Sequence, residues 1–136
     1  MAHEAVKRYS EGASGDFIQD YTVADGTGIE KGALLALTDP RTAILVSAGA
    51  GNQVIAGIAA REKVASDGRT RLSVHKKGYF DMYASGTITI GQCVCSSGTV
   101  NYVSGSNPLT SSGAQILGYA EEAATDGEQV LIRVDL

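Results

Sequence analysis

A weak internal repeat spans most of the chain and constrains its fold more than any other feature of the sequence. Ile29–Leu35 (IEKGALL) is matched by Ile88–Val94 (ITIGQCV), each with an Ile-x-x-Gly step followed by an apolar stretch. Further on, Gln53–Ala59 parallels Gln115–Ala120, and an Asp-Gly pair and a closing apolar stretch follow in both copies. A repeat of this kind indicates two related halves that share one architecture.

Most of the chain consists of short apolar stretches separated by residues that favour tight turns. Asp-Gly, Ser-Gly and Asn-Pro pairs supply the positive φ angles or the fixed proline φ that chain reversals need. The best helical spacing, over Ala56–Val64, contains Gly57 and has no clear capping box before it, so helix is the weaker expectation there. The predicted strands cover residues 17–23, 34–37, 43–47, 54–60, 71–75, 78–84, 87–90, 92–95, 99–103, 115–121 and 129–134. Many short strands at this spacing predict an all-β fold, a small β-barrel or sandwich of two related half-units.

Length and composition indicate the domain organisation. At 136 residues the chain suits one domain, and 43% hydrophobic residues are enough to build a core. Residues 1–20 are mostly polar, without a periodic apolar face, and are predicted to form an extended N-terminal arm. The remaining residues, 21–136, are predicted to form a single β domain.

Charge and hydropathy argue against several classes of partner. A net charge of -4 gives no general cationic surface for nucleic-acid phosphates. No stretch approaches the roughly 20 apolar residues of a membrane span, and the first residues contain no apolar segment typical of a signal peptide. We therefore expect a soluble protein made in the cytoplasm, with neither nucleic acid nor membrane as a partner.

Two segments invite a catalytic interpretation that their surroundings do not support. The glycine-rich stretch Ala48–Gly51 follows an apolar strand, but it lacks the third glycine of a dinucleotide site and is predicted to be a plain turn. His75 is the one plausible base for a hydrolase in the folded region, and no Gly-x-Ser-x-Gly elbow accompanies it. His75–Lys77 is instead predicted to be a charged, exposed turn, with Arg69 and Arg71 nearby; a contact with an acidic protein surface is the alternative.

The two cysteines, Cys93 and Cys95, lie on one face of a predicted strand. Two thiols do not complete a metal site, and no paired-histidine spacing is present to join them. They are too close together for an ordinary disulfide, so we expect reduced, small apolar side chains and no metal. In the repeat Cys93 corresponds to Leu34 and Cys95 to Ala36, which predicts that at least one of them faces the core.

A set of segments in a fixed order resembles a known family. The set comprises the polar N-terminal segment leading into Ile18–Thr22, the Ile-x-x-Gly step at Ile29–Gly32, and Gly86–Val94, followed by Ile116–Ala123 and Asp126–Val134. Together these segments span nearly the whole chain and resemble the small cement, or decoration, proteins of tailed-bacteriophage capsids.

The resemblance implies a structural, non-enzymatic virion protein that binds the exterior of an assembled phage capsid and stabilises it. It implies the major capsid protein as partner, a homotrimer as the usual oligomeric state, and neither catalytic residues nor a cofactor. In such proteins the N-terminal arm commonly lies on the major capsid protein. The isolated large apolar residues of this arm, Tyr9, Phe17 and Ile18, are therefore the expected capsid contacts.

Two other functions stay open at this point. Tyr79, Asp81 and Tyr83 alternate with two apolar residues along one predicted strand, so their face could meet a ligand. A β-sandwich binding module for host-surface glycans would use the rings of Tyr79, Tyr83 and Tyr102. A small trimeric β enzyme would need an active site shared between subunits.

Overall fold

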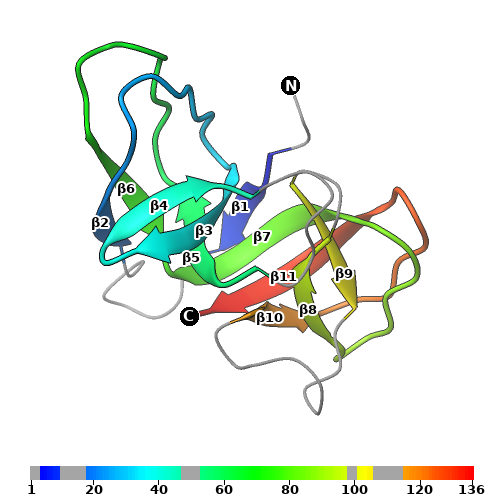
Figure 1. The fold of residues 1–136 in the computed structure, drawn as a ribbon. Coiled ribbons are helices and arrows are strands. Elements are labelled where there is room, and N and C mark those ends of the chain that lie inside the picture. Colours follow the sequence, from blue (N-terminus) through cyan, green and yellow to red (C-terminus); the bar gives the residue numbers. More distant parts are fainter. Residues whose placement is uncertain (1–3, 10–17, 47–52, 98–100, 106–114) are drawn as a thin grey trace.

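The computed structural model describes residues 4–9, 18–46, 53–97, 101–105 and 115–136, and this part of the chain contains β-strands and no α-helix (Figure 1). The strands are β1 (Val6–Tyr9), β2 (Ile18–Thr22), β3 (Leu34–Asp39), β4 (Thr42–Leu45), β5 (Ile55–Ala59), β6 (Arg71–His75), β7 (Lys77–Ala84), β8 (Cys93–Ser96), β9 (Tyr102–Gly105), β10 (Ile116–Ala120) and β11 (Gln129–Asp135). The all-β prediction is confirmed.

The two halves of the chain share one strand order. The first half closes into a barrel in the order β2-β4-β3-β5-β6. The second half forms a sheet in the order β1-β7-β11-β10-β8-β9. A further β7–β9 pairing joins β9 back to β7, so the strands β7 to β11 form a second barrel, with β1 at its edge. In each half the first strand pairs in parallel with the third, Thr22 with Thr42 and Tyr83 with Tyr102. Apart from β1, the second half therefore repeats the first, as the related half-units predict.

The sequence repeat coincides with equivalent structural positions. Ile29 forms an isolated antiparallel bridge with Lys63, and Ile88 forms the same bridge with Ala124. The loops that carry these bridges connect β2 to β3 and β5 to β6 in the first barrel, and β7 to β8 and β10 to β11 in the second. In Figure 1 the two loop pairs project from opposite sides of the molecule.

The strand predicted over residues 87–90 is wrong. Within it only Ile88 makes a bridge. Ile88 is fully buried, whereas Ile90 is 72% exposed, and the chain turns at Gly91, whose φ is 79°. The alternating Thr-Ile-Thr-Ile pattern looks like a half-buried strand, but the turn at the Ile-x-x-Gly step leaves room for a single paired residue.

The buried apolar side chains form two clusters that share a wall. One cluster, which includes Tyr21, Leu35 and Val74, fills the first barrel. The other, which includes Phe80, fills the second barrel and extends to Leu34 on the outer side of the first. Strands β3 and β5 thus have a core on both faces, and every residue of β5 is buried. Each fully buried leucine in this wall stabilises the fold by about 1.5–3 kcal/mol.

A buried asparagine ties the second barrel to the first. Asn101, just before β9, is 3% exposed, and its Oδ1 accepts a hydrogen bond of 2.9 Å from the backbone N–H of Leu34 in β3. Its Nδ2 donates to Glu4 Oε2 over 3.4 Å. Asn101 has a φ of 64°, a left-handed conformation that asparagine tolerates better than most residues. One side chain therefore joins both barrels and the N-terminal segment.

We expect Asn101→Gly to lower the free energy of unfolding by about 1–3 kcal/mol, because the buried N–H of Leu34 loses its acceptor while the φ stays accessible. Asn101→Ala should cost more, since alanine also disfavours this φ. Urea unfolding followed by circular dichroism measures both. The matched control is Arg41→Gly, at the exposed left-handed position of the equivalent turn, where φ is 54° and no loss is expected. Equal stability of Asn101→Gly and wild type would contradict this role.

The exposed charged turn predicted around His75 is wrong. Only Lys76 separates β6 from β7, so the chain passes from one barrel to the other through a single residue. Its Nζ donates to the Tyr21 hydroxyl over 2.6 Å and to the carbonyl of Ala56 over 2.8 Å, and it lies 5.1 Å from the Tyr21 ring centroid. The ring of His75, which is half-buried, lies 5.5 Å from that of Phe80. These half-buried side chains are therefore held by contacts with the two barrels.

Candidate functional site

The N-terminal segment is built into the second sheet. β1 runs antiparallel to β7 and lies at the edge of the sheet. Ahead of it, Ala5 is buried and its N–H donates to the carbonyl of Gly32 over 2.7 Å. Gly32 has a φ of 90°, and a Cβ there would collide with the backbone of Ala5, so only glycine lets this segment pass. Within the described residues β1 pairs only with β7, and Val6 on it is 53% exposed.

The structure describes two of the three expected capsid contacts, and they lie in different strands. Tyr9 ends β1 and pairs with Tyr79 of β7. Ile18 begins β2 and pairs with His75 of β6, in the first barrel. Phe17 lies outside the described residues. Parts of the segment predicted as an arm, residues 6–9 and 18–20, are thus paired strands of this chain, and the capsid contacts themselves stay a prediction.

An open hollow borders the start of β1. It has a volume of about 410 Å³ and is lined by Glu4, Ala5, Val6 and Lys31. Burial and, second, the charge of Glu4 raise the pKa of the nearby Glu30 carboxyl. The carboxyl groups of Glu4 and Glu30 and the ammonium group of Lys31 therefore lie near the start of β1.

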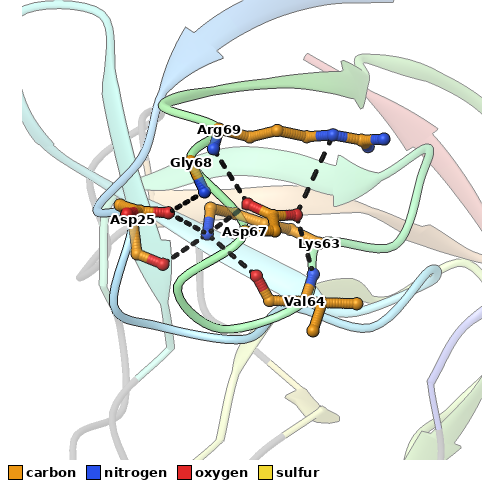
Figure 2. Close-up of polar contacts among 6 residues, drawn as sticks. All are labelled: Asp25, Lys63, Val64, Asp67, Gly68 and Arg69. Atoms are coloured by element: carbon orange, nitrogen blue, oxygen red, sulfur yellow. Dashed lines mark hydrogen bonds and ion pairs between the residues drawn. The ribbon is translucent and has the colours of Figure 1, made fainter.

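A buried lysine is the centre of the best-defined polar cluster, which lies between the two loops of the first barrel (Figure 2). The side chain of Lys63 is fully buried. Its Nζ donates to the carbonyls of Asp25, over 2.5 Å, and Val64, over 3.2 Å. It also lies 3.5 Å from Asp25 Oδ1 and 3.3 Å from Asp67 Oδ1. The carbonyls and carboxylates together offset the cost of burying the charge.

The Asp67-Gly68 turn supplies the acidic side of this cluster. Asp67 accepts hydrogen bonds from the N–H groups of Val64, over 3.2 Å, and Arg69, over 2.9 Å. The bond from Arg69 is the main reason that the pKa of the Asp67 carboxyl is lowered, and Lys63 adds to it. Gly68 N–H donates to Asp25 Oδ1 over 2.7 Å and so connects this turn to the other loop.

Sequence reasoning missed Lys63. The Asp25-Gly26 and Asp67-Gly68 pairs were recognisable as turns, but no local pattern shows that the two turns meet. The available signal was the repeat itself, which aligns Lys63 with the small apolar Ala124 and so marks a charge at a buried position. A lysine at such a position requires acceptors nearby.

The tyrosines of the glycan alternative are only partly brought together. The parallel β7–β9 pairing places Tyr83 beside Tyr102, with ring centroids 5.7 Å apart and planes tilted by 45°. Tyr79 lies further along β7, where it pairs with Tyr9. Because the two neighbouring rings are tilted against each other, they do not form the flat face on which a sugar ring stacks.

The cysteines behave as the repeat predicts. Both are free thiols, and Cys95 is buried with its Sγ 3.7 Å from the carbonyl of Ser104, which confirms that at least one faces the core. In the described residues no group of three or more His, Cys, Asp or Glu side chains is placed to hold a metal ion. The glycine-rich turn predicted at residues 48–51 lies outside the described residues. Across the same described part of the chain, no helix has the length and hydropathy needed to cross a membrane.

Comparison with known proteins agrees with this architecture. A crystal structure described as the head fiber gp8.5 N base in bacteriophage phi29 is similar over 88% of this chain and 95% of that chain, with a TM-score of 0.55 and 18% sequence identity. At 18% sequence identity, this similarity establishes a shared fold and no more. No curated protein matches the chain. The family model described as phage cement protein matches residues 13–136, nearly the full length, and the chain therefore belongs to the phage cement protein family.

Proposed function

We propose that this capsid-associated structural protein binds the outer surface of a phage capsid, contacts the major capsid protein directly and stabilises the shell without catalysing a reaction. The family match over residues 13–136 carries the proposal. Synthesis in the host cytoplasm followed by assembly onto the finished head is part of it.

The edge position of β1 supports a docking mode. An edge strand presents unpaired main-chain N–H and C=O groups, to which an extended segment of another protein can add as a further strand. β1 occupies such an edge, and Tyr9 ends it. The proposed contacts Tyr9, Phe17 and Ile18 would then fill apolar pockets of the capsid while the main chain supplies hydrogen bonds.

A homotrimer is the proposed oligomeric state. Three copies held together make three capsid contacts, and once the first has formed the others become effectively intramolecular, so modest individual affinities suffice. The solution mass by light scattering distinguishes a single 14.0 kDa chain from three.

We expect the purified protein to co-sediment saturably with expanded phage heads that lack it, and the decorated heads to withstand heating that disrupts bare heads. The triple variant Tyr9→Ser, Phe17→Ser, Ile18→Ser should bind at least about tenfold more weakly, since each lost apolar contact removes roughly 1 kcal/mol or more. The control is Val64→Ser, which removes an apolar side chain, 63% exposed, from a loop of the first barrel.

Circular dichroism must show that the triple variant is folded, because Tyr9 and Ile18 lie in strands. Substitution is preferable to deletion of residues 1–16, which would also remove β1 and the buried Ala5. No binding of the wild-type protein to heads would overturn the proposed function, whereas unchanged binding of the triple variant would overturn only the contact residues.

A further inference from the structure

The second barrel has an open pocket where the first barrel has its buried lysine. The pocket has a volume of about 280 Å³, and its lining includes Ile88, Ala124, Thr125 and Glu128. Ile88 and Ala124 are buried, whereas Thr125 and Glu128 are exposed, so the pocket has an apolar floor and a polar rim.

The floor of the pocket is equivalent to the Lys63 position. Ile88 exchanges backbone hydrogen bonds of 2.9 and 3.0 Å with Ala124, as Ile29 does with Lys63 over 2.9 and 2.7 Å. Ala124 thus takes the backbone place of Lys63, and its side chain ends at Cβ. Ala124 lines the open pocket, whereas Lys63 at the equivalent backbone position carries a full lysine stem.

The rim of the pocket carries a carboxylate, that of Glu128, which is equivalent to the carboxylate of Asp67 in the lysine site. Thr125 N–H donates to Glu128 Oε1 over 2.7 Å, as Val64 N–H donates to Asp67 Oδ2 over 3.2 Å. The same turn therefore places a carboxylate at the same position in both barrels. In the first barrel the other oxygen of that carboxylate lies 3.3 Å from the Lys63 ammonium.

A second pair of equivalent contacts confirms the correspondence. Gly127 N–H donates to the carbonyl of Ala84 over 2.8 Å, and Ser66 N–H donates to the carbonyl of Asp25 over 2.7 Å. Gly127 and Ser66 both have positive φ, 84° and 58°. The second barrel therefore reproduces the backbone of the lysine site with alanine at the lysine position.

Glu128 is available to a cation. Its Oε1 also accepts a hydrogen bond of 2.8 Å from Thr125 Oγ1. The backbone N–H of Thr125, followed by its hydroxyl, lowers the pKa of the Glu128 carboxyl, which is ionised at neutral pH. Across the described residues Glu128 Oε2 makes no hydrogen bond or ion pair.

We propose that this pocket receives a lysine side chain from the protein surface on which the chain docks, with the incoming ammonium beside Glu128 as Lys63 lies beside Asp67. The proposal rests on the proposed function, which makes that surface the outside of a phage capsid. A lysine side chain that lies along the open pocket would place its stem on the apolar Ile88 and Ala124 and its ammonium beside the rim carboxylate of Glu128. The position of Asp25 is taken by Ala84, so the pocket offers one carboxylate where the first barrel offers two.

The test is to supply the lysine from within the chain. Ala124→Lys should fill the pocket, leave the melting temperature unchanged or higher, and weaken binding to expanded heads by more than tenfold. Glu128→Gln, which keeps the shape and removes the charge, should weaken binding about five- to tenfold and reduce its dependence on salt. The matched control is Ala65→Lys, which adds the same charge to an exposed position of the equivalent loop in the first barrel and should bind within twofold of wild type.

The outcomes separate this inference from the proposed function. If wild type binds heads and both Ala124→Lys and Glu128→Gln bind equally well, the pocket is not a lysine receptor, although the protein still binds capsids. If Ala124→Lys does not fold, the result for Glu128→Gln decides alone. An equal loss in Ala65→Lys would show a general effect of charge and would also overturn the inference. Failure of wild type to bind would remove the proposed function and this inference with it.

Discussion

Gly118→Ala is expected to destabilise the fold strongly, with a loss of about 3 kcal/mol or more and a fall in Tm of roughly 10 °C or more. A Cβ at Gly118 would overlap the carbonyl oxygen of Arg133 and approach the Arg133 carbonyl carbon to 2.8 Å. Both atoms belong to the backbone of β11, which cannot move without breaking its pairing with β7. The equivalent glycine of the first barrel, Gly57, would collide in the same way with the carbonyl of His75 in β6.

Gly26→Ala is the matched control for this prediction. No atom lies within 4 Å of a Cβ built at Gly26, and its φ is not in the positive range, so the change should stay within about 0.5 kcal/mol. Thermal unfolding of both variants measures the difference. Equal melting temperatures for the two variants would show that the barrel adjusts to a side chain at Gly118 and that close approach of the strands is not required.

Lys63→Ala is expected to cost about 2–3 kcal/mol. Removing one member of a buried ion pair costs about 3–5 kcal/mol when both partners are buried. Here the side chains of Asp25 and Asp67 are 44% and 21% exposed, which reduces the loss. Lys63→Met keeps the apolar stem and separates the loss of charge from the loss of packing. The control is Arg69→Ala, which breaks an exposed ion pair of 3.8 Å and should change stability by less than about 0.5 kcal/mol.

The difference between wild type and Lys63→Met should depend on pH. The hydrogen bond from the Arg69 N–H, and to a smaller extent Lys63, lowers the pKa of Asp67 in the folded state. The contribution of Lys63 therefore stabilises the protein above the ordinary aspartate pKa of about 3.9. That stabilisation is lost as the pH falls through the lowered, folded-state pKa. Unfolding curves at pH 7 and near pH 2 should therefore show a large difference at neutral pH and a small one in acid. A difference that is the same at both pH values would place the role of Lys63 in packing alone.

The repeat allowed the fold to be predicted from the sequence, because the residues that recur in it are required by the local backbone geometry. The bridge positions Ile29 and Ile88 and the close-approach glycines Gly57 and Gly118 recur in order, and the structure shows them at equivalent places. Strand positions followed from the same short-range patterns, with the exception of residues 87–90.

What the sequence did not show depends on contacts between distant residues. β1 carries no alternating pattern over Val6–Tyr9 and exists because β7 offers it a partner. Asn101 and Lys76 are polar residues of ordinary appearance, and their roles depend on Leu34 and Tyr21, which lie far away in the chain. The candidate docking pocket depends on a comparison of two sites that becomes possible only once both barrels are folded.

The shared wall of β3 and β5 has a mechanical consequence for a capsid-associated structural protein. Leu35 packs into the first barrel and its neighbour Leu34 packs against the second, so a force on one barrel reaches the other directly through side chains. The single-residue connection at Lys76 between β6 and β7 therefore need not carry this force. Separating the barrels would expose Leu34 and Ile58 to water. The two barrels should therefore move together as one rigid body under an applied force.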